Sequence, residues 1–274
     1  MKTPNPPLIL CYHSTNVSGH DYALNDHVAL RADLASLHSA GFDLVHASHL
    51  DSAPNAGRPR AAITFDDGMV LDALDFEHPS WGHQDSFLRI LREHHEQTGQ
   101  HCQAASFVIA SPQARAELDR KDFLSLNVWH DDWWQEANDS GYMTIENHSW
   151  DHNHPSLDRS VQRNNERGSF LSIETLDEAL AEIAQASDYI EQRCGRRPSL
   201  FAYPWGQAND YLVEEFFPQR GADLGLTAAF VTTPRVDRPI NRWSIPRWVC
   251  GTDWRSPEDF AALLRRHCET TNPA

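Results

Sequence analysis

Two adjacent carboxylates, and two histidines four residues apart, are the side chains in this chain best suited to chemistry. Asp66 and Asp67 lie in the segment T-F-D-D-G, and about eighty positions later His148 and His152 lie in the segment H-S-W-D-H. Carboxylates and imidazoles bind divalent metal ions, and a metal-bound water loses its proton near pH 7 when a free carboxylate can accept it. The pattern predicts a metal site for hydrolysis with one carboxylate to spare.

Neither half of this pattern is specific by itself. A lone D-D-G more often caps a turn or a helix, and chance pairs of histidines four residues apart are expected in a chain with 16 histidines. The histidine spacing is that of zincin metalloproteases, but Ser149 stands where those enzymes carry their glutamate base. The base must then come from elsewhere, and Asp66 or Asp67 can supply it.

The elements that position these residues follow an alternation of apolar β-rich runs and amphipathic helical stretches. This alternation is typical of an α/β fold with parallel strands, whose active sites lie at the carboxyl ends of the strands. Both clusters follow an expected strand. The expected strands are Leu8–Tyr12, Phe42–His46, Ala61–Phe65, Ala104–Ile109, Tyr142–Ile145, Leu200–Tyr203, Leu226–Thr232 and Ser244–Val249.

Helix signals separate these strands. One helix carries Leu30, Leu34 and Leu37 on one face and ends at Gly41. A second begins at Thr175 with a capping box and ends at Gly195, and a third begins at Ser256-Pro257. The stretches 76–87 and 157–172 are predicted to be long loops.

Length and composition favour one water-soluble domain over residues 1–274. The formal charge of -16 disfavours binding to nucleic acid, which needs a basic face, and no apolar run is long enough for a membrane span. Five scattered cysteines, without a C-x-x-C pair, argue against a disulfide framework. With no secretory signal visible at the N-terminus, we expect a cytoplasmic protein, and the mature form of an exported protein is the alternative.

The combined motifs resemble those of the polysaccharide deacetylases, the NodB-homology domain of carbohydrate esterase family 4. Besides T-F-D-D-G and H-S-W-D-H, the segment F-A-Y-P-W-G at residues 201–206 is similar to the family's third motif. The strand that ends in Tyr12-His13 is similar to the start of the biofilm-type poly-N-acetylglucosamine deacetylases, whose motif order is circularly shifted. The resemblance implies a distorted (β/α) barrel of about seven parallel strands.

The resemblance also implies roles for individual residues. Asp67, His148 and His152 would bind one divalent metal ion, with zinc the first expectation and cobalt, nickel or iron also suited. Asp66 would be the general base, and the backbone N–H of Trp205 would bind the oxyanion.

Two further assignments compensate for departures from the family pattern. The chain lacks the late histidine that usually serves as general acid, so His13 is assigned that role from the circularly shifted relatives. Ala202 replaces the usual arginine of the third motif, and Arg247 is the candidate to steady the base instead. Asp253, in a partial fourth motif, receives no role.

Aromatic residues near these motifs are candidates for contact with a sugar. Trp150, Trp205 and Tyr203 lie inside motifs, and the two tryptophans are expected to line the cleft. Trp81 lies in the long loop that follows Asp67. Trp129, Trp133 and Trp134 are expected in the core.

The predicted function is therefore a metal-dependent hydrolase that removes an acetyl or other acyl group from the nitrogen of an N-acetylated sugar. A hydrolase of a small non-sugar amide and a non-catalytic carbohydrate-binding homologue remain alternatives. A protein with a structural zinc is a third, weaker one, because such a site normally closes all four positions with protein ligands.

Overall fold

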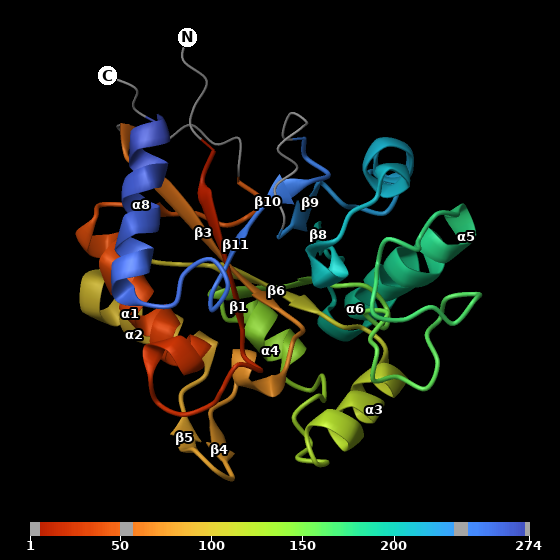
Figure 1. The fold of residues 1–274 in the computed structure, drawn as a ribbon, viewed down its shortest axis with the longest axis horizontal. Coiled ribbons are helices and arrows are strands. Elements are labelled where there is room, and N and C mark those ends of the chain that lie inside the picture. Colours follow the sequence, from red (N-terminus) through yellow and green to blue (C-terminus); the bar gives the residue numbers. More distant parts are fainter. Residues whose placement is uncertain (1–5, 50–56, 233–240, 272–274) are drawn as a thin grey trace.

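Nine strands form one sheet that curls into a nearly closed barrel with helices outside it (Figure 1). The computed structural model describes residues 6–49, 57–232 and 241–271. The sheet order is β10-β9-β8-β7-β6-β3-β1-β11, with β2 beside β3, and all its pairs are parallel. The strands are β1 (Leu8–His13), β2 (Asp43–Leu44), β3 (Arg60–Asp66), β6 (Ala104–Val108), β7 (Met143–Asn147), β8 (Leu200–Ala202), β9 (Ala228–Val231), β10 (Ile245–Pro246) and β11 (Trp248–Val249).

The barrel is closed by a single short segment near the end of the chain. β10 pairs with β9 at one end of the sheet, and β11 pairs with β1 at the other. Arg247 lies between these two strands, so the expected strand Ser244–Val249 is in fact divided at this residue. If β10 and β11 are counted as one strand, seven parallel strands follow one another around the barrel, in agreement with the predicted number.

Helices cover the outside of the barrel. They are α1 (Asp26–Ser39), α2 (Phe87–Thr98), α3 (Pro112–Asp122), α4 (Trp134–Asp139), α5 (Leu176–Ala179), α6 (Gln185–Cys194), α7 (Phe217–Arg220) and α8 (Pro257–Thr271). Two π-helical turns, η4 (Leu180–Ala184) and η6 (Tyr211–Phe216), and short 3-10 turns η1 (Tyr22–Leu24), η3 (Val70–Asp72) and η5 (Pro204–Gly206) complete the path. Among the described residues, no helix combines the length and apolar character needed to cross a lipid bilayer.

The helix signals in the sequence hold in the structure. The side chain of Asn25 caps α1, and Leu30, Leu34 and Leu37 of this helix are buried. Thr175 and Glu178 form the expected capping box, and the helix that they begin ends at Gly195 in the left-handed conformation.

Alternating strand residues fill the barrel interior with small and aromatic side chains. Ala62, Ala105, Phe107, Ala202 and Phe230 belong to one buried cluster in which several strands meet. Their neighbours along the strands face the helices, so both faces of the sheet are apolar, as parallel sheets require.

One loop prediction was wrong and one is confirmed. The stretch 76–87 contains an antiparallel hairpin of β4 (Phe76–His78) and β5 (Gly82–Gln84), because Gly82 allows a tight turn with φ of 67°. The stretch 157–172 contains no regular helix or strand.

Candidate active site

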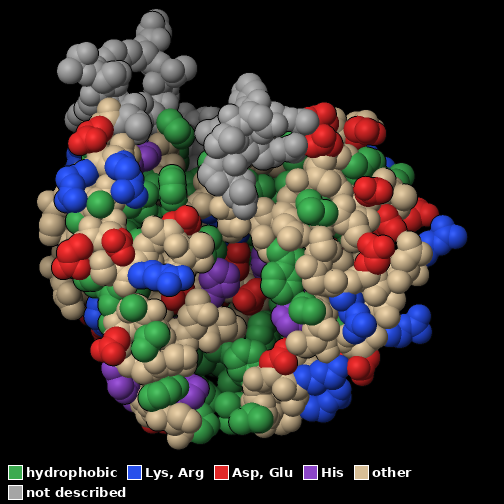
Figure 2. All heavy atoms as spheres, in the orientation of Figure 1, with side chains coloured by type: hydrophobic (Ala, Val, Ile, Leu, Met, Phe, Trp, Pro, Cys, Tyr) green, Lys and Arg blue, Asp and Glu red, His purple; other side chains and the backbone are tan. Residues whose placement is uncertain are grey.

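The strand ends bring the predicted chemical groups to one side of the barrel. His13 is the last residue of β1 and is in register with Asp66, the last residue of β3. His148 follows the last residue of β7, which neighbours β6 in the sheet. These residues line a cleft of about 520 Å³, and Figure 2 shows histidine and acidic side chains exposed in a hollow near the middle of this face.

Asp67, His148 and His152 meet in this cleft with the spacing of metal ligands. One carboxylate oxygen of Asp67 lies 3.7 Å from Nε2 of His148 and 3.7 Å from Nε2 of His152. Ligands about 2.1 Å from a tetrahedral zinc ion stand roughly 3.4 Å apart, so the three donors fit around one ion. With only three protein donors, such a site keeps a position open for water or substrate.

The two imidazoles are prepared to act as ligands. Nδ1 of His148 donates to the carbonyl oxygen of Ala202 at 2.8 Å, which fixes the ring with Nε2 directed at Asp67. Burial, followed by the charge of His148, holds the pKa of His152 well below its ordinary value. A neutral imidazole is the form that binds a metal ion.

The turn after β3 requires a glycine. Asp67 and Gly68 both adopt positive φ, 75° and 77°. A Cβ atom on Gly68 would lie 2.5 Å from Cγ1 of Val108 and 2.9 Å from its Cα, so a side chain at this position would collide with β6. The glycine therefore lets β3 turn sharply enough for Asp66 and Asp67 to face the same cleft.

Asp66 is held by Arg247 in a buried two-point ion pair. Nη1 and Nη2 of the guanidinium donate to the two carboxylate oxygens at 2.6 Å each, and the Arg247 and Asp66 side chains are 0% and 4% exposed. Burial alone would raise the pKa of Asp66, but the charge of Arg247, and then that of His148, hold this pKa well below its usual range. Asp66 is thus ionised, and the residue predicted to steady it does contact it.

His13 ends β1, which lies on the other side of β3 from β7, the strand that precedes the metal-binding histidines. Its backbone N–H donates to the carboxylate of Asp26 at 2.8 Å, which ties the end of β1 to the start of α1. Its ring lines the cleft, and its buried Nδ1 has no hydrogen-bond partner in the described part of the chain. His13 therefore lies in the same cleft as the three possible metal ligands and Asp66.

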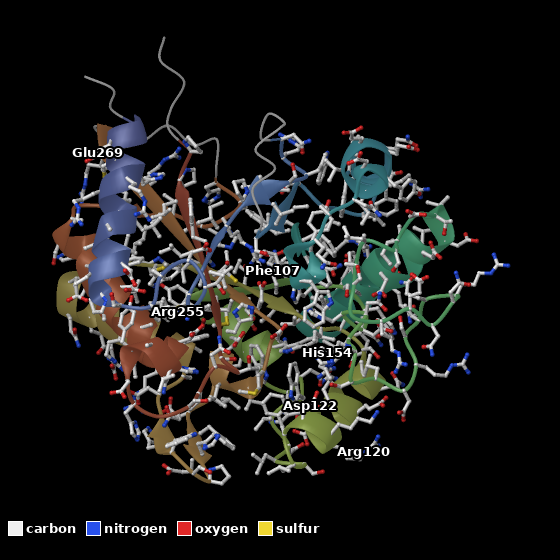
Figure 3. The ribbon with its side chains drawn as sticks, viewed as in Figure 1. Phe107, Arg120, Asp122, His154, Arg255 and Glu269 are labelled. Atoms are coloured by element: carbon white, nitrogen blue, oxygen red, sulfur yellow. The ribbon has the colours of Figure 1, made fainter. Side chains whose placement is uncertain are left out.

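Trp205 forms part of the cleft wall beside the imidazoles. Its ring lies 4.7 Å from that of His152 and 5.6 Å from that of His154, and the residue is 39% exposed. His154 also lines the cleft, and Figure 3 labels it near Asp122 of α3. The exposed ring of Trp205 provides a flat surface beside the metal ligands.

Three predicted sugar contacts are not supported by their positions. Tyr203 is fully buried, and its hydroxyl donates to the carbonyl of Trp243 at 2.9 Å, so it has no surface for a substrate. Trp150 packs against Tyr189 and does not line the cleft. Trp81 is 40% exposed between β4 and β5, and it too is absent from the cleft wall.

Other lining residues were not predicted. On the side of β6 and α3 these are mainly apolar, and on the side of β1 and β11 mainly polar. They include Ile109, Leu118, Asp122, Phe123 and Trp129 on the first side, and Thr15, Asn16, Thr252 and Asp253 on the second. Several follow strand ends, which is the only signal in the sequence that points to them.

Comparison with known proteins identifies the family. The family described as polysaccharide deacetylase matches residues 53–228, more than half of the chain, and the chain therefore belongs to that family. His13 and Arg247 lie outside the matched range. No curated protein matches the chain.

Solved structures agree on the fold. A deacetylase, PplD, from Streptococcus pyogenes is 16% identical with a TM-score of 0.61, and the match covers 99% of this chain and 100% of that one. IcaB from Ammonifex degensii is 16% identical with a TM-score of 0.60, covering 94% and 96%. A de-N-acetylase from Aggregatibacter actinomycetemcomitans is 16% identical with a TM-score of 0.58, covering 93% and 100%. This family and fold support carbohydrate deacetylation.

Proposed function

We propose that this chain is a metal-dependent amide hydrolase that removes an acyl group, acetyl in the simplest case, from the nitrogen of an N-acylated sugar. The observation that carries the proposal is the convergence of Asp67, His148 and His152 beside a separate, ionised Asp66. A site built only for binding sugar has no need of a base next to three metal donors. Zinc is the proposed ion, and cobalt, nickel or iron suit the same donors.

The residues of the chain divide the work of hydrolysis. Asp67, His148 and His152 would hold the ion, which supplies Lewis acidity and an acidic water when bound. Asp66 takes up a proton from the attacking water, and Arg247 keeps that carboxylate ionised and oriented. The backbone N–H of Trp205 donates to the oxygen that becomes negative, a contact worth about 2.7–4 kcal/mol.

His13 is proposed to protonate the departing amine. Because β1 and β6 flank β3 on opposite sides, His13 and the residues after β6 lie on opposite sides of Asp66. The amine would therefore leave toward Asn16 and Thr252, and the acyl group would point toward Ile109. The polar wall suits a sugar and the apolar wall suits an acyl group.

Two substitutions test this proposal. Asp66→Asn should retain the metal and lose turnover, because it removes the base and leaves the ligands in place. His148→Ala should lose both metal and turnover. Metal content and amine release are measured on a soluble N-acetylglucosamine, its oligosaccharides and small N-acetylated amides. Hydrolysis by Asp66→Asn at the wild-type rate would contradict the assignment of the base.

The same measurements separate the alternatives. Release of amine from simple amides, but from none of the sugars, favours the small-amide hydrolase. Sugar binding without amine release from any compound favours the non-catalytic homologue. Wild-type protein that binds no divalent ion after purification and reloading contradicts the metal site itself.

A further inference from the structure

A wide helical turn lies directly beneath the loop that carries the two metal-binding histidines. The helix that begins at Thr175 changes from α5 to the π-helical turn η4 and then to α6. Such turns are rare and are frequent at functional sites, because the extra residue alters which groups face a neighbour. Glu182 lies in η4 and is fully buried.

The carboxyl group of Glu182 accepts hydrogen bonds from the histidine loop. Oε2 accepts from the backbone N–H of Trp150 at 3.2 Å and of Asp151 at 3.4 Å. Oε1 accepts from Nε2 of Gln162 at 2.8 Å, in the long segment 157–172. Trp150 and Asp151 stand between His148 and His152, so Glu182 supports the middle of the loop at whose ends the ligands lie.

Asn147 fastens the start of the same loop to the same turn. Its side-chain amide donates to the carbonyl oxygen of Ile183 at 2.9 Å and to Oγ of Ser187 at 2.8 Å. Its Oδ1 accepts from the backbone N–H of Ser149 at 2.7 Å. The loop 147–152 is therefore held to the turn η4 at two points, by Asn147 and by Glu182.

A buried carboxyl group needs a reason to be present. An apolar side chain would pack in this position without the cost of removing a polar group from water, but it would leave the N–H groups of the loop unsatisfied. Asp151 reinforces the loop, since its carboxylate accepts from the N–H groups of Asn153 at 2.8 Å and Val161 at 2.5 Å. The polar contacts of Glu182 thus go to the histidine loop and to Gln162 of the neighbouring segment.

We propose that Glu182 is a positioning residue for the metal site, and that together with Asn147 it fixes the loop so that His148 and His152 can bind the same ion. The inference rests on the proposed function, because it presupposes that these histidines bind a metal. Partners that orient metal ligands typically contribute 10–100-fold to metal affinity. Loss of this support should weaken affinity by a similar factor.

Metal affinity separates this role from simple support of the core. Glu182→Leu should raise the dissociation constant for Zn²⁺ 10–100-fold, measured by competition with a chelator of known affinity. Glu182→Gln should stay within about threefold of wild type. Glutamine keeps a side-chain oxygen that can accept from the N–H groups of Trp150 and Asp151, so the amide can replace the carboxyl group.

A matched control and a second variant complete the test. Glu191→Leu makes the same chemical change in α6, where the carboxylate pairs with Arg197 at the surface, and should leave the dissociation constant unchanged. Asn147→Ala removes the second attachment and should weaken Zn²⁺ binding at least fivefold. If Glu182→Leu does not fold, as judged by circular dichroism of the metal-free protein, the Zn²⁺ affinity of Asn147→Ala tests the positioning role instead.

The outcomes distinguish this inference from the proposed function. Wild-type affinity in folded Glu182→Leu, or in folded Asn147→Ala, overturns the positioning role. So does a loss in Glu182→Gln as large as that in Glu182→Leu. If the wild-type protein itself binds no Zn²⁺, the metal site fails and this inference fails with it.

Discussion

Replacement of Arg247 by methionine should strongly destabilise the protein. The substitution keeps much of the side-chain volume and removes the positive charge that contacts both oxygens of Asp66. Both partners are almost fully buried, so the variant leaves a carboxylate without its counter-charge in the barrel. Breaking a buried ion pair in this way costs about 3–5 kcal/mol, whereas an exposed pair contributes about 0–1 kcal/mol.

The assay is urea unfolding of the metal-free protein, followed by circular dichroism. Arg31→Met is the matched control, because Arg31 pairs with Asp85 and Glu93 at the surface and is 42% exposed. This control should lose at most about 1 kcal/mol. In the double variant with Asp66→Asn, the loss should be smaller than the sum of the two single losses, since no buried charge is left alone.

The pH dependence of this loss follows from the pKa of Asp66. A depressed pKa contributes stability above the pKa of the unfolded chain, about 3.9, and that stability is lost as the pH falls through the lower folded value. Without Arg247 the burial of Asp66 dominates, so the difference between wild type and variant should shrink from pH 7 to pH 4. A loss below 1 kcal/mol at pH 7 in Arg247→Met would refute the reasoning.

Two further predictions concern stability. Burial raises the pKa of Asp33 to about 7 despite three hydrogen-bond donors, so its contribution to stability is present below pH 4 and is lost as the pH rises to 7. As the pH rises from 4 to 7, the free energy of unfolding, measured with urea, should fall about 4 kcal/mol less in Asp33→Asn than in wild type. An equal fall in the two proteins would contradict this prediction. Gly68→Ala should lower the free energy of unfolding by about 2–5 kcal/mol. The new Cβ would collide with Val108, and alanine is strained at the positive φ of this position. Gly99→Ala, with similar φ and no atom within 4 Å, should lose only about 1–2 kcal/mol, and equal losses would show that the contact with Val108 is unimportant.

The aromatic predictions show the limit of reasoning from motifs. Tyr203 and Trp205 are two residues apart in one motif, yet Tyr203 is buried and Trp205 is 39% exposed in the cleft. At Trp205 the chain turns with φ of 61°, which directs its side chain differently from a strand residue. The residue types of this motif do not predict the turn. Membership in the motif therefore could not show that Trp205 lines the cleft and that Tyr203 lies in the core.

Local signals in the sequence were enough to predict the order of the strands and helices and the positions of the main site residues. Apolar runs, caps and glycines act over a few residues, so the order of strands and helices could be predicted, as could the places of Asp66, Asp67, His148 and His152 at strand ends. Because parallel strands put their carboxyl ends on one side, the meeting of these four groups followed from the fold class.

The tertiary structure decided the contacts between distant segments. Arg247 reaches Asp66, 181 positions away, because the segment between β10 and β11 closes the barrel beside β1. Glu182 reaches the histidine loop because a π-helical turn faces the end of β7. Neither pairing has a local signature, since each depends on how the closed barrel packs segments that the chain itself keeps far apart.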